Sequence, residues 1–262
     1  MYAFEFVKPS SIAEAVAALQ AEDAQALGGG QTLIPTLKQR LASPGTLVSL
    51  TGIAELCRVF VDRGGRLVVG GGTTHAQVAR EGGHYPALAA LASRIGDPAV
   101  RNRGTIGGSL ANNDPSADYP AGALGSGATI VTTTREIAAD DFFQGMFTTV
   151  LEPGEIITEV RFPVPSAANY QKFLQPASRF ALTGVFVARF ADGVRVAVTG
   201  ASNDGVFRWS EAEAALTSSF SPDALSGLSV AADGMIGDLH GTPEYHANLV
   251  KVLTRRAVAA AG

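Results

Sequence analysis

The chain has 262 residues, of which 46% are hydrophobic and 17% charged, so it can bury the core of one large or two ordinary domains. The net charge is −4 and the basic residues are scattered, which argues against a protein that binds nucleic acid or an anionic membrane. No signal-like start and no stretch of about 20 apolar residues is present, so we expect a cytoplasmic protein without a transmembrane segment. The single Cys57 cannot supply the four thiolates of an ordinary [2Fe–2S] cluster, so any such cluster must lie on another chain.

The first half of the chain predicts mixed helices and strands. Ser11 and Glu14 have capping-box spacing ahead of a helix over residues 12–19, and Leu33, Leu37 and Leu41 mark a second helix by their helical spacing. The other elements expected here are strands at 24–27 and 46–50, a hairpin of 58–62 with 67–69, a helix capped by Thr73 or Thr74, and a helix from Pro86.

The second half continues with strands at 128–133 and 156–162, followed by the proline-rich segment 163–166, which has the composition of a domain linker. Asp192-Gly193 predicts a hairpin turn between strands 183–190 and 194–198. Helices should follow, one capped by Ser210 with Glu213 and one by Thr242 with Pro243. We therefore expect an α+β protein of two domains, residues 1–165 and 166–262.

Glycine triplets stand at two places in the chain. Gly28–Gly30 lie between a predicted strand and helix, where bare backbone can approach a phosphate, although the loop lacks the GxGxxG pattern. A plain tight turn is the alternative. Gly70–Gly72 lead to His75, for which the alternative is a ligand-binding or covalent-attachment role. His75 has no metal-binding companion at useful spacing, so we interpret it as lying in the first turn of a helix capped by Thr73 or Thr74.

The segment from Gly96 to Pro120 shows almost no periodicity, and we expect a long irregular loop that binds a ligand. Its glycines allow close approach, and its side chains supply hydroxyl, amide and carboxylate groups that suit ribose or ribityl hydroxyls. For Asp114 the alternative is an Asx turn. Arg101 and Arg103 could neutralise a diphosphate or pair with carboxylates of a neighbouring subunit. Neither GxSxG nor a Cys paired with a motif His appears, so hydrolysis has no support.

Three segments then point to a known family. GGGQTLIP, GDPAVRNRGTIGGSLANNDPSAD and FFQGMFTTVLEPGEIITEVRFP occur in this order and together resemble the FAD-binding medium subunit of the molybdenum hydroxylases, which include xanthine dehydrogenase and aerobic carbon monoxide dehydrogenase. The resemblance implies a two-subdomain FAD-binding domain of the vanillyl-alcohol-oxidase-like (PCMH) type, split near residues 55–60. A smaller C-terminal α+β domain of the carbon monoxide dehydrogenase flavoprotein type would follow it.

The resemblance also implies the residues that bind FAD, without a covalent bond. Lys172 matches a lysine near the flavin ring, with an exposed strand lysine as the alternative, and Phe180 matches an aromatic that shields the ring. Arg179 stands where relatives often carry Asp. The cofactor-binding candidates are Leu27, Gly28, Gly29, Gly30, Gln31, Thr32, Leu33, Ile95, Arg103, Thr105, Ile106, Gly107, Gly108, Asn112, Asp114, Asp118, Ile157, Lys172 and Phe180.

The implied function is electron transfer. The flavin performs the redox chemistry, and this explains why the chain lacks an acid–base set. Electrons would come from [2Fe–2S] clusters on a small partner subunit, after substrate oxidation at molybdopterin-bound molybdenum on a large one, within a heterohexamer. The alternatives are a free-standing FAD-dependent oxidoreductase and a non-catalytic nucleotide-binding assembly module.

Overall fold

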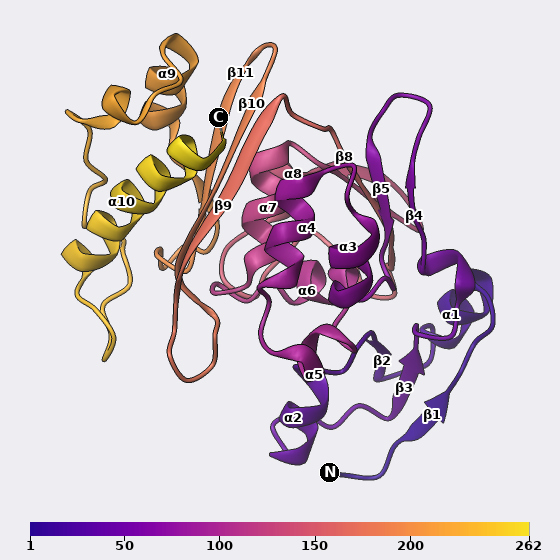
Figure 1. Cartoon of the computed structure of the whole chain (residues 1–262). Coiled ribbons are helices and arrows are strands. Elements are labelled where there is room, and N and C mark those ends of the chain that lie inside the picture. The colour runs from indigo at the N-terminus through magenta and orange to yellow at the C-terminus, as the bar shows by residue number, and fades with distance from the viewer. Residues whose placement is uncertain (262) are drawn as a thin grey trace.

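A computed structural model describes residues 1–261, which form an α+β protein of three sheets with helices packed against them (Figure 1). The first sheet is small and parallel, with the order β1 (Glu5–Val7), β3 (Thr46–Ser49), β2 (Ala24–Leu27). Helix α1 (Ile12–Ala18) joins β1 to β2, and its cap is the predicted one, because the Ser11 side chain accepts from the Glu14 amide.

Helix α2 (Leu33–Lys38) is shorter than expected, and Leu41 lies outside it with 74% of its surface exposed. The cause is a Schellman-type ending. Arg40 adopts φ +61, its amide donates to Leu37 O, and the Leu41 amide donates to Thr36 O. The prediction from leucine spacing was therefore wrong at the last turn.

The second sheet is antiparallel, in the order β4 (Val59–Val61), β5 (Leu67–Gly70), β8 (Ile157–Phe162), β6 (Thr129–Thr132), β7 (Glu136–Ala138). The predicted hairpin is confirmed, with Val59 opposite Val69. Strand β8 lies between β5 and β6 in the sheet, although both strands come before it in the sequence. The remaining elements of this part are the 3₁₀ turn Ala54–Leu56 and helices α3 (His75–Glu81), α4 (Pro86–Ser93) and α8 (Ala139–Phe142).

The long loop expected from Gly96 to Pro120 is not irregular, and that prediction was wrong. It contains α5 (Pro98–Arg101), α6 (Ile106–Asn112) and the start of α7 (Asp118–Ser126). Side-chain caps begin the first two helices: Asp97 accepts from the Val100 amide and Thr105 from the Gly108 amide. Every residue of α7 is buried, so packing outweighs its poor helix propensity.

The third sheet is antiparallel, in the order β12 (Phe207–Arg208), β11 (Gly193–Thr199), β10 (Ala181–Phe190), β9 (Ala167–Leu174). The Asp192-Gly193 hairpin is confirmed, because Phe190 pairs with Gly193. Helices α9 (Ser210–Ser218) and α10 (Pro243–Ala261), with the 3₁₀ turn Pro222–Leu225 near them, cover one face, and α4 and α7 lie against the other (Figure 1).

The two helix starts predicted in this part have different outcomes. Thr242 caps α10, since its hydroxyl accepts from the Tyr245 amide at 3.3 Å. Ser210 does not cap α9: the capping position is Trp209, which makes no side-chain cap bond. The Glu213 carboxylate instead accepts from the Val196 amide of β11 and from Arg208 of β12.

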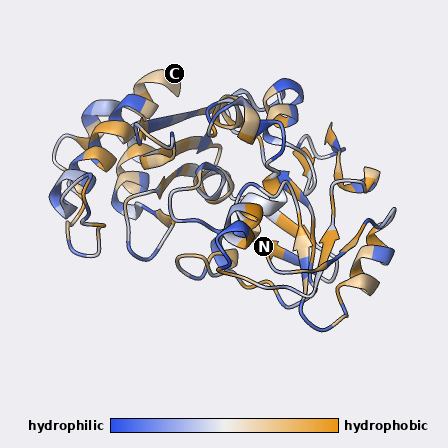
Figure 2. Ribbon diagram, turned by 90° about the horizontal axis from the view of Figure 1, so that it is seen from below, coloured by the Kyte–Doolittle hydropathy of each residue, from blue (hydrophilic) through white to orange (hydrophobic). Residues whose placement is uncertain are grey.

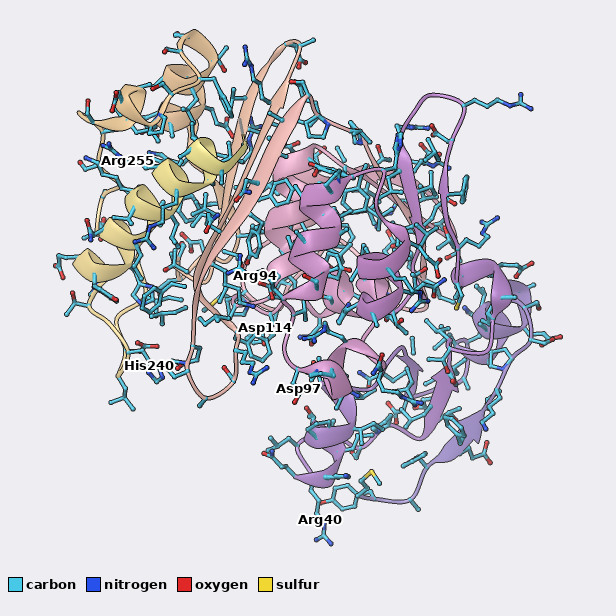
Figure 3. All side chains as sticks on the ribbon, in the orientation of Figure 1. Arg40, Arg94, Asp97, Asp114, His240 and Arg255 are labelled. Atoms are coloured by element: carbon cyan, nitrogen blue, oxygen red, sulfur yellow. The ribbon has the colours of Figure 1, made fainter. Side chains whose placement is uncertain are left out.

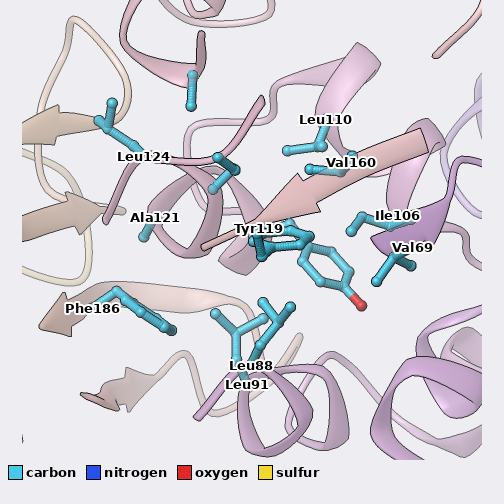
Figure 4. Packing of buried hydrophobic residues seen from close by; sticks show 14 of the residues in the cluster. Val69, Leu88, Leu91, Ile106, Leu110, Tyr119, Ala121, Leu124, Val160 and Phe186 are labelled. Atoms are coloured by element: carbon cyan, nitrogen blue, oxygen red, sulfur yellow. The ribbon is translucent and has the colours of Figure 1, made fainter. Parts of the chain in front are cut away.

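The largest core joins the second and third sheets. Phe186 of β10 belongs to the same buried cluster as Leu88 and Leu91 of α4 and Tyr119 of α7 (Figure 4). The peripheral helices carry both hydrophobic and hydrophilic residues, as elements with one buried face should (Figure 2). Within residues 1–261 no helix has the length and apolar character needed to cross a membrane.

Candidate functional site

A cavity of about 530 Å³ lies where three glycine-rich turns meet. The turns are Gly28–Gly30 after β2, Gly70–Gly72 after β5, and residues 104–108 at the start of α6. The volume is within the usual range for a site that holds an organic cofactor.

Close backbone contact explains the glycines of this junction. A Cβ on Gly29 would stand 1.9 Å from Arg103 O, and one on Gly107 would stand 2.5 Å from Gly71 O. The Gly107 amide donates to Gly71 O at 2.9 Å, and the His75 amide donates to Gly104 O at 3.0 Å. Any side chain at Gly29 or Gly107 would push these turns apart.

Some backbone amides around the cavity donate hydrogen bonds within the described chain, and others do not. In the first turn of α6, Ile106 N donates to Thr73 O and Gly108 N to the Thr105 hydroxyl. In contrast, the amides of residues 29–32 make no hydrogen bond to any atom of residues 1–261, and these residues line the cavity. Several unpaired amides at one turn form a site for an anion such as a diphosphate.

Asp118 lies on the cavity wall and is held from behind by the third sheet. The Tyr170 hydroxyl donates to it at 2.6 Å, and Lys172 Nζ lies 2.9 Å from its Oδ1. Burial raises the pKa of the Asp118 carboxyl, and the charge of Lys172 opposes that rise. Lys172 is only 6% exposed, so the interpretation as an exposed strand lysine was wrong.

Asp114 forms the Asx turn considered for it and also lies at the cavity. Its Oδ1 accepts from the Ser116 amide at 2.9 Å, which is the Asx turn, and the residue also lines the cavity. Burial raises the pKa of its carboxyl. Figure 3 shows Asp114 above Asp97, the residue that caps α5.

Sixteen of the nineteen candidate residues line the cavity, and Arg103, Ile106 and Lys172 do not. Arg103 is exposed outside it, and Ile106 lies in the core. Lys172 lies behind Asp118. Arg101 donates to Ile95 O and Gly96 O, so its guanidinium holds the loop that contains Ile95. The candidates that line the cavity are Leu27, Gly28, Gly29, Gly30, Gln31, Thr32, Leu33, Ile95, Thr105, Gly107, Gly108, Asn112, Asp114, Asp118, Ile157 and Phe180.

Sequence reasoning missed several lining residues, among them Gly71, His75 and Glu155. The second glycine triplet was the available signal for Gly71 and His75. The expected helix start is confirmed there, since Thr74 accepts from the Gln77 amide at 3.3 Å, but the same helix start also presents His75 to the cavity.

The carboxylate of Glu155, which lines the cavity, is held by hydrogen bonds from neighbouring side chains. Glu155 accepts from Arg135, Thr132 and Thr134, and the hydrogen bond from Arg135 is the main cause that lowers its pKa to about 2. Within residues 1–261 no three His, Cys, Asp or Glu side chains gather as metal ligands would. Two of the lining carboxylates, Asp118 and Glu155, are thus committed to ion pairs with Lys172 and Arg135.

Comparisons with known proteins agree with this geometry. The family model described as "FAD binding domain in molybdopterin dehydrogenase" matches residues 2–165. The carbon monoxide dehydrogenase medium chain of Afipia carboxidovorans is 33% identical, with 97% of this chain and 95% of that protein covered. The nicotine 6-hydroxylase medium subunit of Paenarthrobacter nicotinovorans is 34% identical, with 99% and 98% covered. The solved quinoline 2-oxidoreductase of Pseudomonas putida 86 has a chain with TM-score 0.88 and 28% identity, with 99% of this chain and 97% of that chain covered.

The fold is accordingly the α+β fold of the PCMH type, as expected. The chain belongs to the family of FAD-binding medium subunits of the molybdenum hydroxylases, and it is an oxidoreductase subunit.

Proposed function

We propose that this chain binds FAD non-covalently in the cavity and transfers electrons from [2Fe–2S] clusters of a small partner subunit to an external acceptor. The large partner would carry molybdopterin-bound molybdenum, and the complex would be a cytoplasmic heterohexamer with two copies of each subunit. We also retain as proposals the domains 1–165 and 166–262 and the subdomain split near 55–60.

The observation that carries the proposal is the set of free amides at residues 29–32 beside the glycine junction. A diphosphate needs several donors and close backbone approach, and this turn offers both. The residues present therefore fit FAD. The sixteen lining candidates would hold the cofactor, and Lys172 would act through Asp118.

Bound FAD would supply the redox chemistry, since it can accept and release electrons that no side chain here can carry. The chain's own residues would bind and orient it. The amides of residues 29–32 would donate to the diphosphate, and Asp118 would accept from a hydroxyl of the cofactor. Phe180 stands at the cavity with 44% of its surface exposed, where it would limit access of water.

The test is purification of the chain with its natural partners, followed by an absorption spectrum, a metal analysis and a mass measurement of the intact complex. We expect flavin that acid precipitation releases, together with iron, molybdenum and two additional polypeptides. A yellow chain without partners that small organic substrates reduce would instead indicate a free-standing oxidoreductase. A chain that binds no flavin when supplied with excess FAD would leave only the assembly module.

A further inference from the structure

His75 is a buried side chain whose position at the cavity has no explanation in the helix cap alone. It is 5% exposed and lines the cavity, and its Nδ1 has no hydrogen-bond partner among residues 1–261. A buried nitrogen without a partner is costly, so its retention calls for a reason.

Tyr119, whose ring packs against that of His75, also has a buried polar atom that lacks a hydrogen-bond partner within the part of the chain that the structure describes. The ring of Tyr119 lies 5.3 Å from that of His75, and the Tyr119 hydroxyl is likewise buried without a partner in the described chain. A hydroxyl can donate and an unprotonated Nδ1 can accept. One buried water or a small rotation would therefore satisfy both groups.

Such a pairing would fix the tautomer of the ring. When Nδ1 is the acceptor, the proton of the neutral imidazole must be on Nε2. Nε2 lies beside Gly104, because a Cβ built on that glycine would stand 2.5 Å from it. Gly104 in turn adjoins Gly29, whose own Cβ would stand 2.6 Å from Gly104 Cα. Gly104 therefore connects the Nε2 edge of the ring with Gly29, the first residue of the turn that carries the free amides.

We propose that His75 is a cofactor-binding residue that donates from Nε2 to the diphosphate of FAD, and that Tyr119 positions its ring through Nδ1. This inference rests on the proposed function. In the chain alone, burial, followed by the charge of Arg101, lowers the pKa of His75 to about 4, so the neutral ring has one nitrogen free to donate and one free to accept. Of the titratable groups, Tyr119 packs its ring against that of His75, and the positive charge of Arg101 acts on the His75 pKa.

The test compares FAD affinity of the full chain and three variants by titration of the flavin-free protein. His75→Leu removes the donor, and we expect FAD to bind about 10- to 100-fold more weakly, the range for one hydrogen bond to a charged acceptor. His75→Gln keeps a donor and should recover part of the loss. His84→Gln changes an exposed histidine and should bind like the parent protein.

A second measurement needs no substitution. Nitrogen-15 NMR of the four histidines should show His75 protonated on Nε2 in the FAD-loaded protein. A His75 ring protonated on Nδ1, or a folded His75→Leu variant with unchanged FAD affinity, would overturn the inference while leaving FAD binding intact. Failure of the parent protein to bind FAD would contradict the proposed function instead.

Discussion

Lys172 on β9 lies 2.9 Å from a carboxylate oxygen of Asp118 at the start of α7, so the third sheet supports a wall of the cavity that the first half of the chain builds. The Asp118 and Lys172 side chains are 3% and 0% exposed. A pair this deeply buried is costly to break, because the partner left behind keeps an uncompensated charge.

Lys172→Met should therefore destabilise the protein by about 3–5 kcal/mol, as measured by urea unfolding near pH 7. The loss should shrink at lower pH, because an unpaired Asp118 can take up a proton. The double variant Asp118→Asn with Lys172→Met should recover part of the stability. Lys38→Met, at an exposed position, is the control. Equal effects of the Lys172 and Lys38 substitutions would show that the buried pair contributes nothing.

Gly29→Ala should disrupt the glycine junction. Its Cβ would stand 1.9 Å from Arg103 O, which is backbone and cannot move aside cheaply. We expect a lower melting temperature and weaker binding of FAD. Gly83→Ala is the matched control, because nothing lies within 4 Å of a Cβ there. That control should be neutral or stabilise the protein by up to about 1 kcal/mol. A Gly29→Ala variant with the parent's melting temperature and FAD affinity would disprove the required contact.

The pKa of His75 predicts how stability changes with pH. The folded protein holds this pKa at about 4, below the ordinary 6.5, so protons bind the unfolded chain first as the pH falls. Above about pH 6.5, His75 should not change the free energy of unfolding. Between pH 6.5 and pH 4 it should lower that free energy progressively, by about 3 kcal/mol at pH 4.

The check compares unfolding free energies of the parent protein and His75→Gln at several pH values. Because glutamine does not titrate, the parent should lose stability relative to the variant across this window. Parallel curves from pH 7 to pH 4 would mean that the His75 ring titrates normally in the folded protein. Burial also raises the pKa values of Asp114 and Asp118. Both proteins contain these two carboxyl groups, so their contributions cancel in the difference between the two unfolding free energies.

Local patterns predicted most of the elements because their causes are local. The Asp192-Gly193 turn, the Thr74 cap and the Pro86 helix start depend on neighbouring residues alone, and all three are found. The failures have non-local causes. Helix α7 forms because it is completely buried, and Glu213 bonds to β11 rather than to its own helix start. No local pattern contains that information.

The candidate site divides in the same way. The motif residues at 28–32, with Thr105, Gly107 and Gly108, were predicted and do line one cavity. For His75 the helix start was preferred over a ligand role, because the close approach of Gly104 to its ring exists only in the folded chain. The Lys172 ammonium bonds to Asp118 and Arg94 O, and this contact between distant segments has no signature in the sequence. Its expected place near the flavin ring stays a prediction.

Phe180 offers a test of access to the bound flavin. It lines the cavity at the end of a turn in which Arg179 adopts φ +63, and it is 44% exposed. Because the ring is half outside the core, Phe180→Ala should cost no more than about 1 kcal/mol in stability. It should, however, shift the absorption bands of bound FAD, since water would replace the aromatic ring near the cofactor. Leu174→Ala is the control, because Leu174 is equally exposed at 44% and does not line the cavity. Identical flavin spectra for Phe180→Ala and the parent protein would rule out Phe180 as the shielding residue.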